Sequence, residues 1–266
     1  MKRMRYLFST VCIALLMCGS ALAQDDAADL AKAAQNPVAD LISLPFQNNT
    51  NFNVGPNDKT QNILNIQPVA PFKLSVDWNL ITRTIVPVIS QPGLVPGQDR
   101  TNGLGDISFT AFLSPAKPAT LVWGAGPVFL LPTATDDVLG SDKWGIGPSV
   151  VLLAMPGKWV VGSLFSNVWS FAGSGDQGVN LFTWQYFINY NLPDGWYLTS
   201  SPIITANWEA DSGNKWTVPF GGGVGKIFRI GKQPMNAQVQ AFYNVEKPDN
   251  GPDWTLRLQL QFLFPK

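Results

Sequence analysis

Residues 253–264, at the end of the chain, alternate between apolar and polar side chains. One face carries Trp254, Leu256, Leu258, Leu260, Phe262 and Phe264, and the other carries Thr255, Arg257, Gln259 and Gln261, with Leu263 as its apolar member. A period of two predicts a β-strand between two unlike environments. Strands of globular proteins usually run about 5–6 residues, whereas a tilted strand that crosses a bilayer needs roughly 9–11. The length therefore favours a membrane-spanning strand over a strand of a soluble sandwich or barrel.

The same period extends back to residue 41, and turn-forming clusters divide residues 41–266 into about twelve strands. They are expected at 42–54, 61–70, 78–89, 104–114, 120–131, 144–154, 158–170, 179–190, 195–207, 215–228, 234–245 and 253–264. Every second connection, beginning with the first, is longer or more polar, and most of the others are tight. Outer-membrane barrels have an even number of strands, short periplasmic turns and longer outer loops. The chain therefore predicts an all-β fold, a transmembrane antiparallel β-barrel with both ends in the periplasm.

The tryptophans, except Trp184, are expected at or near strand ends. Those on the periplasmic side are Trp78, Trp123, Trp159 and Trp196, and those on the outer side are Trp144, Trp169, Trp208, Trp216 and Trp254. An indole has an apolar body and an N–H group that seeks water, so two aromatic belts are typical of a barrel in a bilayer. A soluble sandwich would use tryptophan in its core and place it at strand centres.

The alternation assigns an apolar face to the lipid and a polar face to the lumen. Outward candidates are Leu44, Phe46, Phe52, Leu64, Ile66, Phe72, Ile107, Phe109, Leu113, Phe182, Trp184, Tyr186, Ile188 and Tyr190. Candidates for the lining of a pore are Arg83, Asp106, Arg257, Gln259, Gln185, Asn65 and Gln67. The charged members have two interpretations: a salt-bridge network that holds the wall, or a constriction that sets charge preference.

The start of the chain has the pattern of a secretory signal peptide over residues 1–23. A basic stretch precedes an apolar stretch, and Ala21-Leu22-Ala23 provides a cleavage site of small residues. The apolar stretch is too short for a spanning helix, which needs about 20 residues, and a lipoprotein that begins at Cys18 is the alternative. Residues 24–40 predict a short amphipathic helix that ends at Pro37. This segment is either a periplasmic tail or a helix folded onto the barrel mouth.

Inward glycines are expected on several strands, for example Gly221, Gly223 and Gly225, and Gly124 and Gly126. Glycine within a strand often marks a bend or a close approach of another group. The first interpretation is curvature of the barrel. The second is that the glycines clear room in the lumen, for a substrate path or for residues 24–40 as a plug.

Several kinds of chemistry are missing from the sequence. It contains no histidine, and its two cysteines, Cys12 and Cys18, lie within residues 1–23, so His-based catalysis and thiolate metal sites are not expected. The GGGVGK run at 221–226 lacks the full phosphate-loop pattern, and Asp136-Asp137 fits a solvated outer loop. Without residues 1–23 the chain is net acidic, which argues against nucleic acid as a partner. No catalytic, cofactor or metal site is predicted, and a protease that uses acidic residues is the remaining enzyme hypothesis.

Several runs resemble a bacterial family of outer-membrane barrels named for the MetA pathway of phenol degradation. They are LISLPFQNNTNFNVGP (41–56), NLITRTIVPVISQPG (79–93), GLGDISFTAFLSP (103–115), WYLTSSPIITANWEA (196–210) and the closing QFLFPK. The resemblance covers nearly all of the chain that follows residue 23. It implies a passive channel for small, hydrophobic or aromatic molecules, in contact with outer-membrane lipid and lipopolysaccharide and inserted by the barrel assembly machinery. A structural or adhesive barrel with a closed lumen is the alternative.

Overall fold

The structure, a computed structural model, describes residues 24–95, 97–117 and 119–265. The expected signal peptide, residues 1–23, lies outside them. The helices and strands are α2 (Gln24–Gln35), β1 (Ile42–Val54), β2 (Lys59–Ile66), β3 (Val69–Lys73), β4 (Trp78–Gln91), β5 (Thr101–Leu104), β6 (Ile107–Pro115), β7 (Leu121–Leu131), η1 (Asp137–Leu139), β8 (Lys143–Ala154), β9 (Trp159–Gly173), β10 (Asn180–Asn191), η2 (Pro193–Gly195), β11 (Trp196–Ser200), β12 (Ile203–Asn207), β13 (Trp216–Ile230), β14 (Gln233–Glu246) and β15 (Trp254–Phe264). No helix among the described residues is long and apolar enough to cross a membrane.

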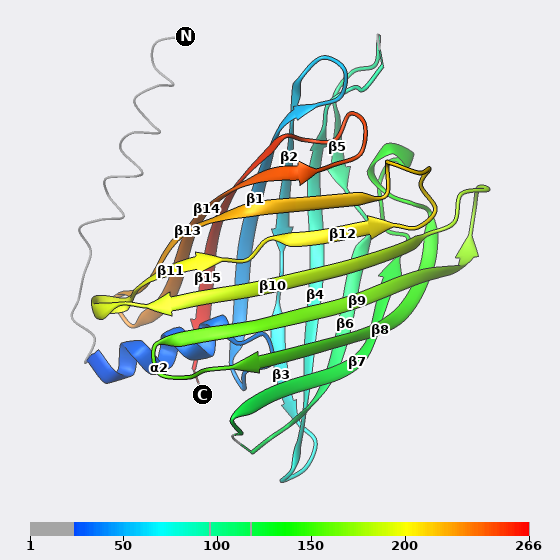
Figure 1. Cartoon of the computed structure of the whole chain (residues 1–266). Coiled ribbons are helices and arrows are strands. Elements are labelled where there is room, and N and C mark those ends of the chain that lie inside the picture. The colour runs from blue at the N-terminus through cyan, green and yellow to red at the C-terminus, as the bar shows by residue number, and fades with distance from the viewer. Residues whose placement is uncertain (1–23, 96, 118, 266) are drawn as a thin grey trace, which may run out of the picture.

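The strands form one closed antiparallel barrel (Figure 1). Neighbours in sequence pair with each other, and β15 closes the ring on β1 from Ile42↔Phe264 to Phe52↔Trp254. Three barrel strands are interrupted, into β2 and β3, β5 and β6, and β11 and β12, so the 15 segments make a 12-stranded wall. Two interruptions contain a proline, Pro68 and Pro202, which lacks the N–H group that a central strand needs. The predicted strand number and fold class are confirmed.

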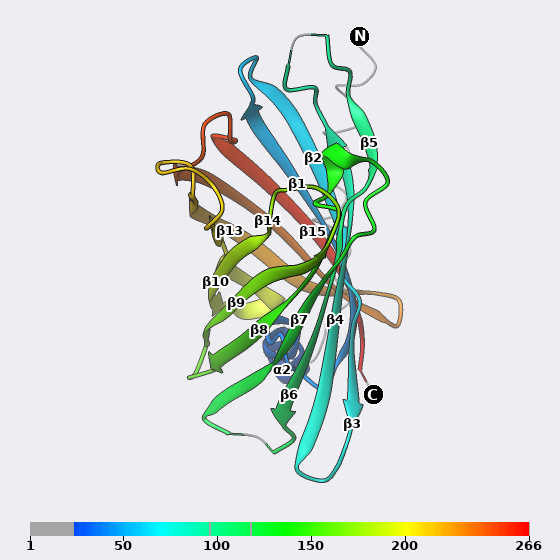
Figure 2. The same ribbon diagram turned by 90° about the vertical axis from the view of Figure 1, so that its right-hand side faces the viewer.

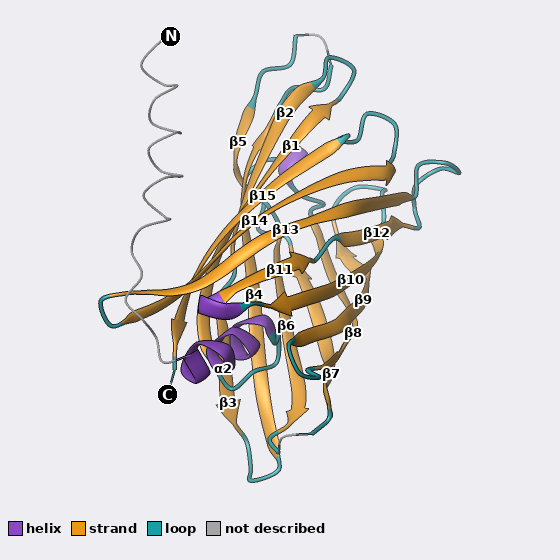
Figure 3. Cartoon of the chain, turned by 60° about the vertical axis from the view of Figure 1, so that its left-hand side comes forward, coloured by secondary structure: helices purple, strands orange, loops and turns teal. Residues whose placement is uncertain are grey.

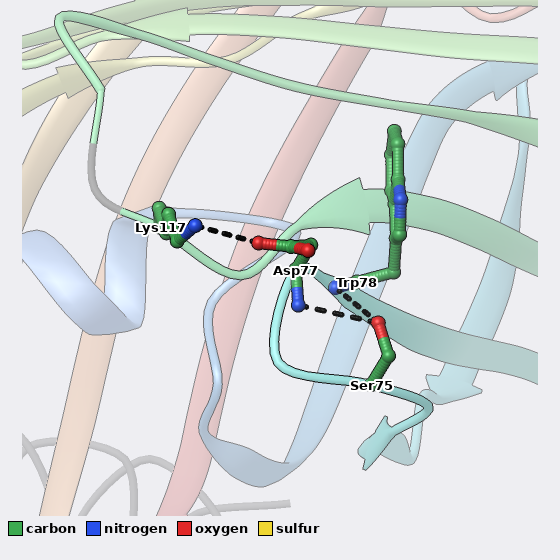
Figure 4. A network of polar contacts seen from close by, with 4 residues as sticks. All are labelled: Ser75, Asp77, Trp78 and Lys117. Atoms are coloured by element: carbon green, nitrogen blue, oxygen red, sulfur yellow. Dashed lines mark hydrogen bonds and ion pairs between the residues drawn. The ribbon is translucent and has the colours of Figure 1, made fainter.

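The two ends of the barrel differ in their connections (Figure 2). We call one the short-turn end, where β3–β4, β6–β7, β8–β9, β10–β11 and β13–β14 are joined, and the other the long-loop end. At the short-turn end, Ser75 Oγ accepts hydrogen bonds from the backbone N–H groups of Asp77 and Trp78 at 3.2 and 3.1 Å. Lys117 of the next turn reaches Asp77 at 2.6 Å (Figure 4). This pair ties two neighbouring turns together beside Trp78.

Aromatic side chains gather near both ends of the outer surface. Trp78 packs against Trp123 at a centroid distance of 5.9 Å at the short-turn end, and Trp208 packs against Trp216 at 5.4 Å at the other. The register also places the predicted apolar positions on the outer face: Phe46 lies opposite Ile66, and Phe109 lies opposite Phe129. An apolar band between two aromatic belts is the surface that a bilayer requires.

The inner face is less uniformly polar than the alternation predicts. At the short-turn end of the lumen, β4, β6, β8, β9 and β10 present a buried apolar cluster, comprising Ile81, Phe112, Val151, Leu153, Val160, Leu164 and Phe187. The prediction of a polar lumen face is wrong for this part of the wall. Its physical reason is that Val38, from the N-terminal segment, packs into the same cluster and needs apolar partners.

Candidate functional site

The N-terminal segment lies within the short-turn end of the barrel, where α2 is framed by strands (Figure 3). Ala31 of α2, at 2% exposure, packs with Leu41, Tyr197, Ile227 and Leu263, which belong to the chain after the helix and to β11, β13 and β15. Leu263 is the one apolar residue on the inward face of the last strand, and this contact explains it. One side of the segment is therefore seated on the β11–β15 wall.

Tyr197 is the aromatic residue of β11 that packs in the same cluster as α2. Its hydroxyl donates to Asn236 Oδ1 at 2.5 Å, and Asn236 donates in turn to Gln261 at 3.0 Å. Gly225 lies directly opposite Tyr197 in the register of β11 and β13, and a Cβ atom at Gly225 would overlap the Tyr197 ring. This glycine of the predicted inward stripe clears room for a neighbouring aromatic side chain, which lies flat on the wall beneath α2.

The other side of the segment contacts the opposite wall. Val38 is 5% exposed within the apolar cluster of β4 to β10. A Cβ atom at Gly124 on β7 would lie 3.0 Å from Val38 Cγ1, so this glycine permits the close approach. Gln35, the last residue of α2, donates to Asn191 Oδ1 at 2.9 Å. The segment thus reaches from one wall of the lumen to the other.

A cavity of about 140 Å³ lies against the C-terminal end of α2, inside the barrel. Amide side chains dominate its lining, namely Gln47, Gln67, Gln185, Asn189, Gln238, Gln259 and Gln261. Arg83 brings the one guanidinium to this lining, and Phe187 brings an aromatic ring. Of the residues predicted to line a pore, Arg83, Gln67, Gln185 and Gln259 therefore share one cavity.

Arg257 is built into the wall. It is 6% exposed, its Nε donates to Asn49 Oδ1 at 2.9 Å, and its Nη1 donates to the backbone oxygen of Ser201 at 2.8 Å. The guanidinium also stacks over Phe242 at 4.9 Å. Ser201 sits in the interruption between β11 and β12, where its N–H group donates to Gln240 Oε1 at 3.0 Å. Arg257 and Gln240 thus satisfy backbone groups that the interrupted strand leaves without ladder partners.

The two other predicted lining residues lie apart from the cavity lining. Asn65 faces inward between Gln47 of β1 and Pro87 of β4. Asp106 lies in the interruption between β5 and β6, where its carboxylate accepts from the backbone N–H groups of Thr133, Ala134 and Ser141 and from Ser141 Oγ, at 2.6 to 3.2 Å. Asp106 therefore anchors the loop between β7 and β8, a role that the strand pattern did not suggest.

The residues that the sequence missed are those that hold the N-terminal segment. Tyr197, Val38 and Leu41 carry no chemistry that marks a site, and only the apolar Leu263 and the inward glycines pointed toward a buried partner. No group of three or more metal-ligating side chains is present in the described part of the chain.

No protein-family model matches the chain, and no curated protein matches it. Among solved structures, the COG4313 outer membrane channel from Pseudomonas putida F1 matches with a TM-score of 0.64 and 18% sequence identity, over 86% of this chain and 97% of that one. Outer membrane phospholipase A from Escherichia coli has a TM-score of 0.45 and 14% identity over 92% and 99% of the two chains. The CymD monoaromatic hydrocarbon channel has a TM-score of 0.46 and 9% identity over 94% and 95%.

The first of these structures shares the fold, and the chain is an outer-membrane β-barrel. A fold does not by itself decide between transport and catalysis, and the chemistry of this chain's own residues has to do so.

Proposed function

We propose that the protein is a passive outer-membrane channel for small, hydrophobic or aromatic molecules, in the family named for the MetA pathway of phenol degradation that the sequence resembles. The observation that carries the proposal is the amide-lined cavity within the barrel, which contains Arg83 and Phe187. A lumen with polar groups and open space gives a small solute partners along its way. A hydrolase of the Ser–His type is disfavoured because the chain has no histidine.

Residues 24–40 are the gate of this channel. The segment is held on one wall by Ala31 and on the other by Val38, so its displacement widens the short-turn end. We assign that end to the periplasm, because short turns face the periplasm in outer-membrane barrels. Lipid and lipopolysaccharide then surround the apolar band, and the barrel assembly machinery inserts the chain.

Deletion of residues 25–38, with residues 1–23 kept for export, tests the gate. The purified deletion variant in a planar bilayer should show a higher single-channel conductance than the full chain, while its mobility shift on heating in SDS shows that the barrel has folded. Equal conductance of two folded barrels would contradict the gate.

A structural barrel with a closed lumen is the second candidate. It is favoured by the apolar packing of the segment against both walls, which fills the short-turn end. The same bilayer measurement separates the two, because a structural barrel gives no conductance with the full chain and swelling assays of vesicles detect no solute entry.

A further inference from the structure

Arg83 brings a full positive charge to the cavity and has few partners there. Its Nη2 donates to Gln67 Oε1 at 2.6 Å, and this is its one hydrogen bond to the described residues. The ion pairs of the described residues are Lys117–Asp77 and Lys247–Asp253, both in connections between strands. A guanidinium has five N–H donors, so most of the donors of Arg83 are left for another group.

The surroundings of Arg83 add positive charge. Arg257, another arginine on an inward strand face, donates from Nε to Asn49 and from Nη1 to Ser201. The C-terminal end of α2 makes a negative contribution, because Ala33 and Ala34 line the cavity. A helix C-terminus is equivalent to roughly −0.5 of an elementary charge, which offsets only part of the charge of one arginine. Arg83 is the one charged side chain among the described residues that line the cavity, and a bound anion would neutralise its charge.

The size and lining of the cavity indicate what kind of anion fits. Its volume of about 140 Å³ is close to that of an engineered cavity of roughly 150 Å³ that binds benzene, so it holds one six-membered ring. Phe187, Pro45 and Val69 supply apolar surface for a ring. The planar fork of a guanidinium matches a carboxylate with two parallel hydrogen bonds.

We propose that this cavity is a binding subsite for small aromatic monocarboxylates, with the carboxylate on Arg83 and the ring against Phe187. Benzoate is the simplest member of the class. The inference rests on the proposed channel function and names its substrate class. The amides of Gln47 and Gln259, which make no hydrogen bond to another described side chain, orient the bound carboxylate.

Isothermal titration of the purified full chain in detergent tests the subsite, with benzoate, the neutral benzamide and acetate as probes. The full chain should bind benzoate more tightly than benzamide or acetate. Arg83→Gln should lose about tenfold to a hundredfold in benzoate affinity, the value of hydrogen bonds to a charged group, and should lose little affinity for benzamide. Arg83→Lys keeps the positive charge but not the planar guanidinium, so it should lose less benzoate affinity than Arg83→Gln. Arg100→Gln is the matched control, since Arg100 binds Ser90 and Thr60 away from the cavity lining.

Two results would overturn the proposal. One is equal affinity of the full chain for benzoate and benzamide, a comparison that needs no variant to fold. The other is an unchanged benzoate affinity in a folded Arg83→Gln barrel. Binding of acetate as tight as that of benzoate would remove the aromatic part of the claim. Titration requires no conduction, so a chain that binds benzoate but passes no solute would contradict the channel and leave the subsite standing.

Discussion

Gly124 offers a way to displace the N-terminal segment without changing it. We expect Gly124→Leu to unseat the segment and to increase the time the channel spends open. A Cβ atom at this position would already lie 3.0 Å from Val38 Cγ1, 3.3 Å from Phe112 Cβ and 3.4 Å from Val151 Cγ1, whereas carbon atoms prefer separations of about 3.5–4.0 Å. The remaining carbons of leucine have to take the space that Val38 occupies.

The magnitude follows from what Val38 loses. Overpacking a well-packed core costs about 1–3 kcal/mol, and expulsion of a buried valine forfeits about 1.5–3 kcal/mol of burial. The overpacking cost applies only while the segment is docked, and the loss of burial applies only when it leaves. The free energy of docking should therefore weaken by about 1–3 kcal/mol, which is roughly a factor of 5 to 150 in the equilibrium constant.

Two measurements check this expectation. Single-channel recordings give the open fraction, and a cysteine introduced by Ala34→Cys, in a chain whose own cysteines both precede residue 24, gives the rate of maleimide labelling. Both should rise in Gly124→Leu. Gly178→Leu is the control, because the nearest atom to a Cβ at Gly178 is 3.6 Å away, in ordinary contact. Unchanged open fraction and labelling rate in a folded Gly124→Leu barrel would refute the docking of Val38 as the restraint.

Three further predictions concern the wall and the topology. Arg257→Met should lower the free energy of unfolding in lipid vesicles by about 3 kcal/mol, because it removes two hydrogen bonds from a charged donor; a loss no larger than that of Arg83→Gln would contradict its role as a strut. Gly225→Ala should cost about 1–3 kcal/mol by overpacking and should raise the labelling rate of the segment, since the Tyr197 ring has to move; equal labelling would show that the ring does not seat α2. An epitope tag within residues 91–103 should react on intact cells, whereas one at 155–158 should react only after the outer membrane is opened, and equal reactivity would reverse or refute the assignment of the ends.

Much of the fold could be predicted because a bilayer imposes a simple rule on a barrel. The rule of apolar outside and polar inside holds for most positions of β1, β10 and β15, and the strand positions follow from it. The lumen obeys no such rule, because the residue types on its wall depend on the groups that pack inside it. The apolar inner faces of β8 and β9 are explained by the N-terminal segment, which lies some hundred residues earlier in the chain and packs there through Val38.

The two lumen arginines show the same limit at the level of single residues. Arg83 and Arg257 both stand on polar faces of predicted strands, and the sequence offered a strut and a selectivity site as alternatives for each. The partners decide between them. Arg257 binds Ser201, whose backbone is freed by an interruption that the sequence did not reveal, whereas Arg83 has one hydrogen bond and lines the cavity.

The outer surface also departs from the rule on β1. Asn48 and Thr50 share the outward face of β1 with Phe46 and Phe52, and Asn62 of β2 lies beside them. The two asparagines exchange hydrogen bonds of 2.9 and 3.0 Å, and Thr50 joins both. Lipid supplies no partner for an amide, so each asparagine is tolerated because of the other.

This pairing predicts that replacing both Asn48 and Asn62 costs less unfolding free energy than replacing either one alone. Asn62→Leu should destabilise the barrel by about 1–3 kcal/mol, because the Asn48 Nδ2 group then faces lipid without its acceptor, while Thr50 still donates to Asn48 Oδ1. Asn48→Leu should do the same, and the double variant should recover most of the loss, since replacement of both partners by apolar groups is nearly neutral. Unfolding by guanidinium in lipid vesicles, followed by tryptophan fluorescence, measures all three. If the double variant loses the sum of the single losses, the amides do not depend on each other and face a source of hydrogen bonds other than this pair.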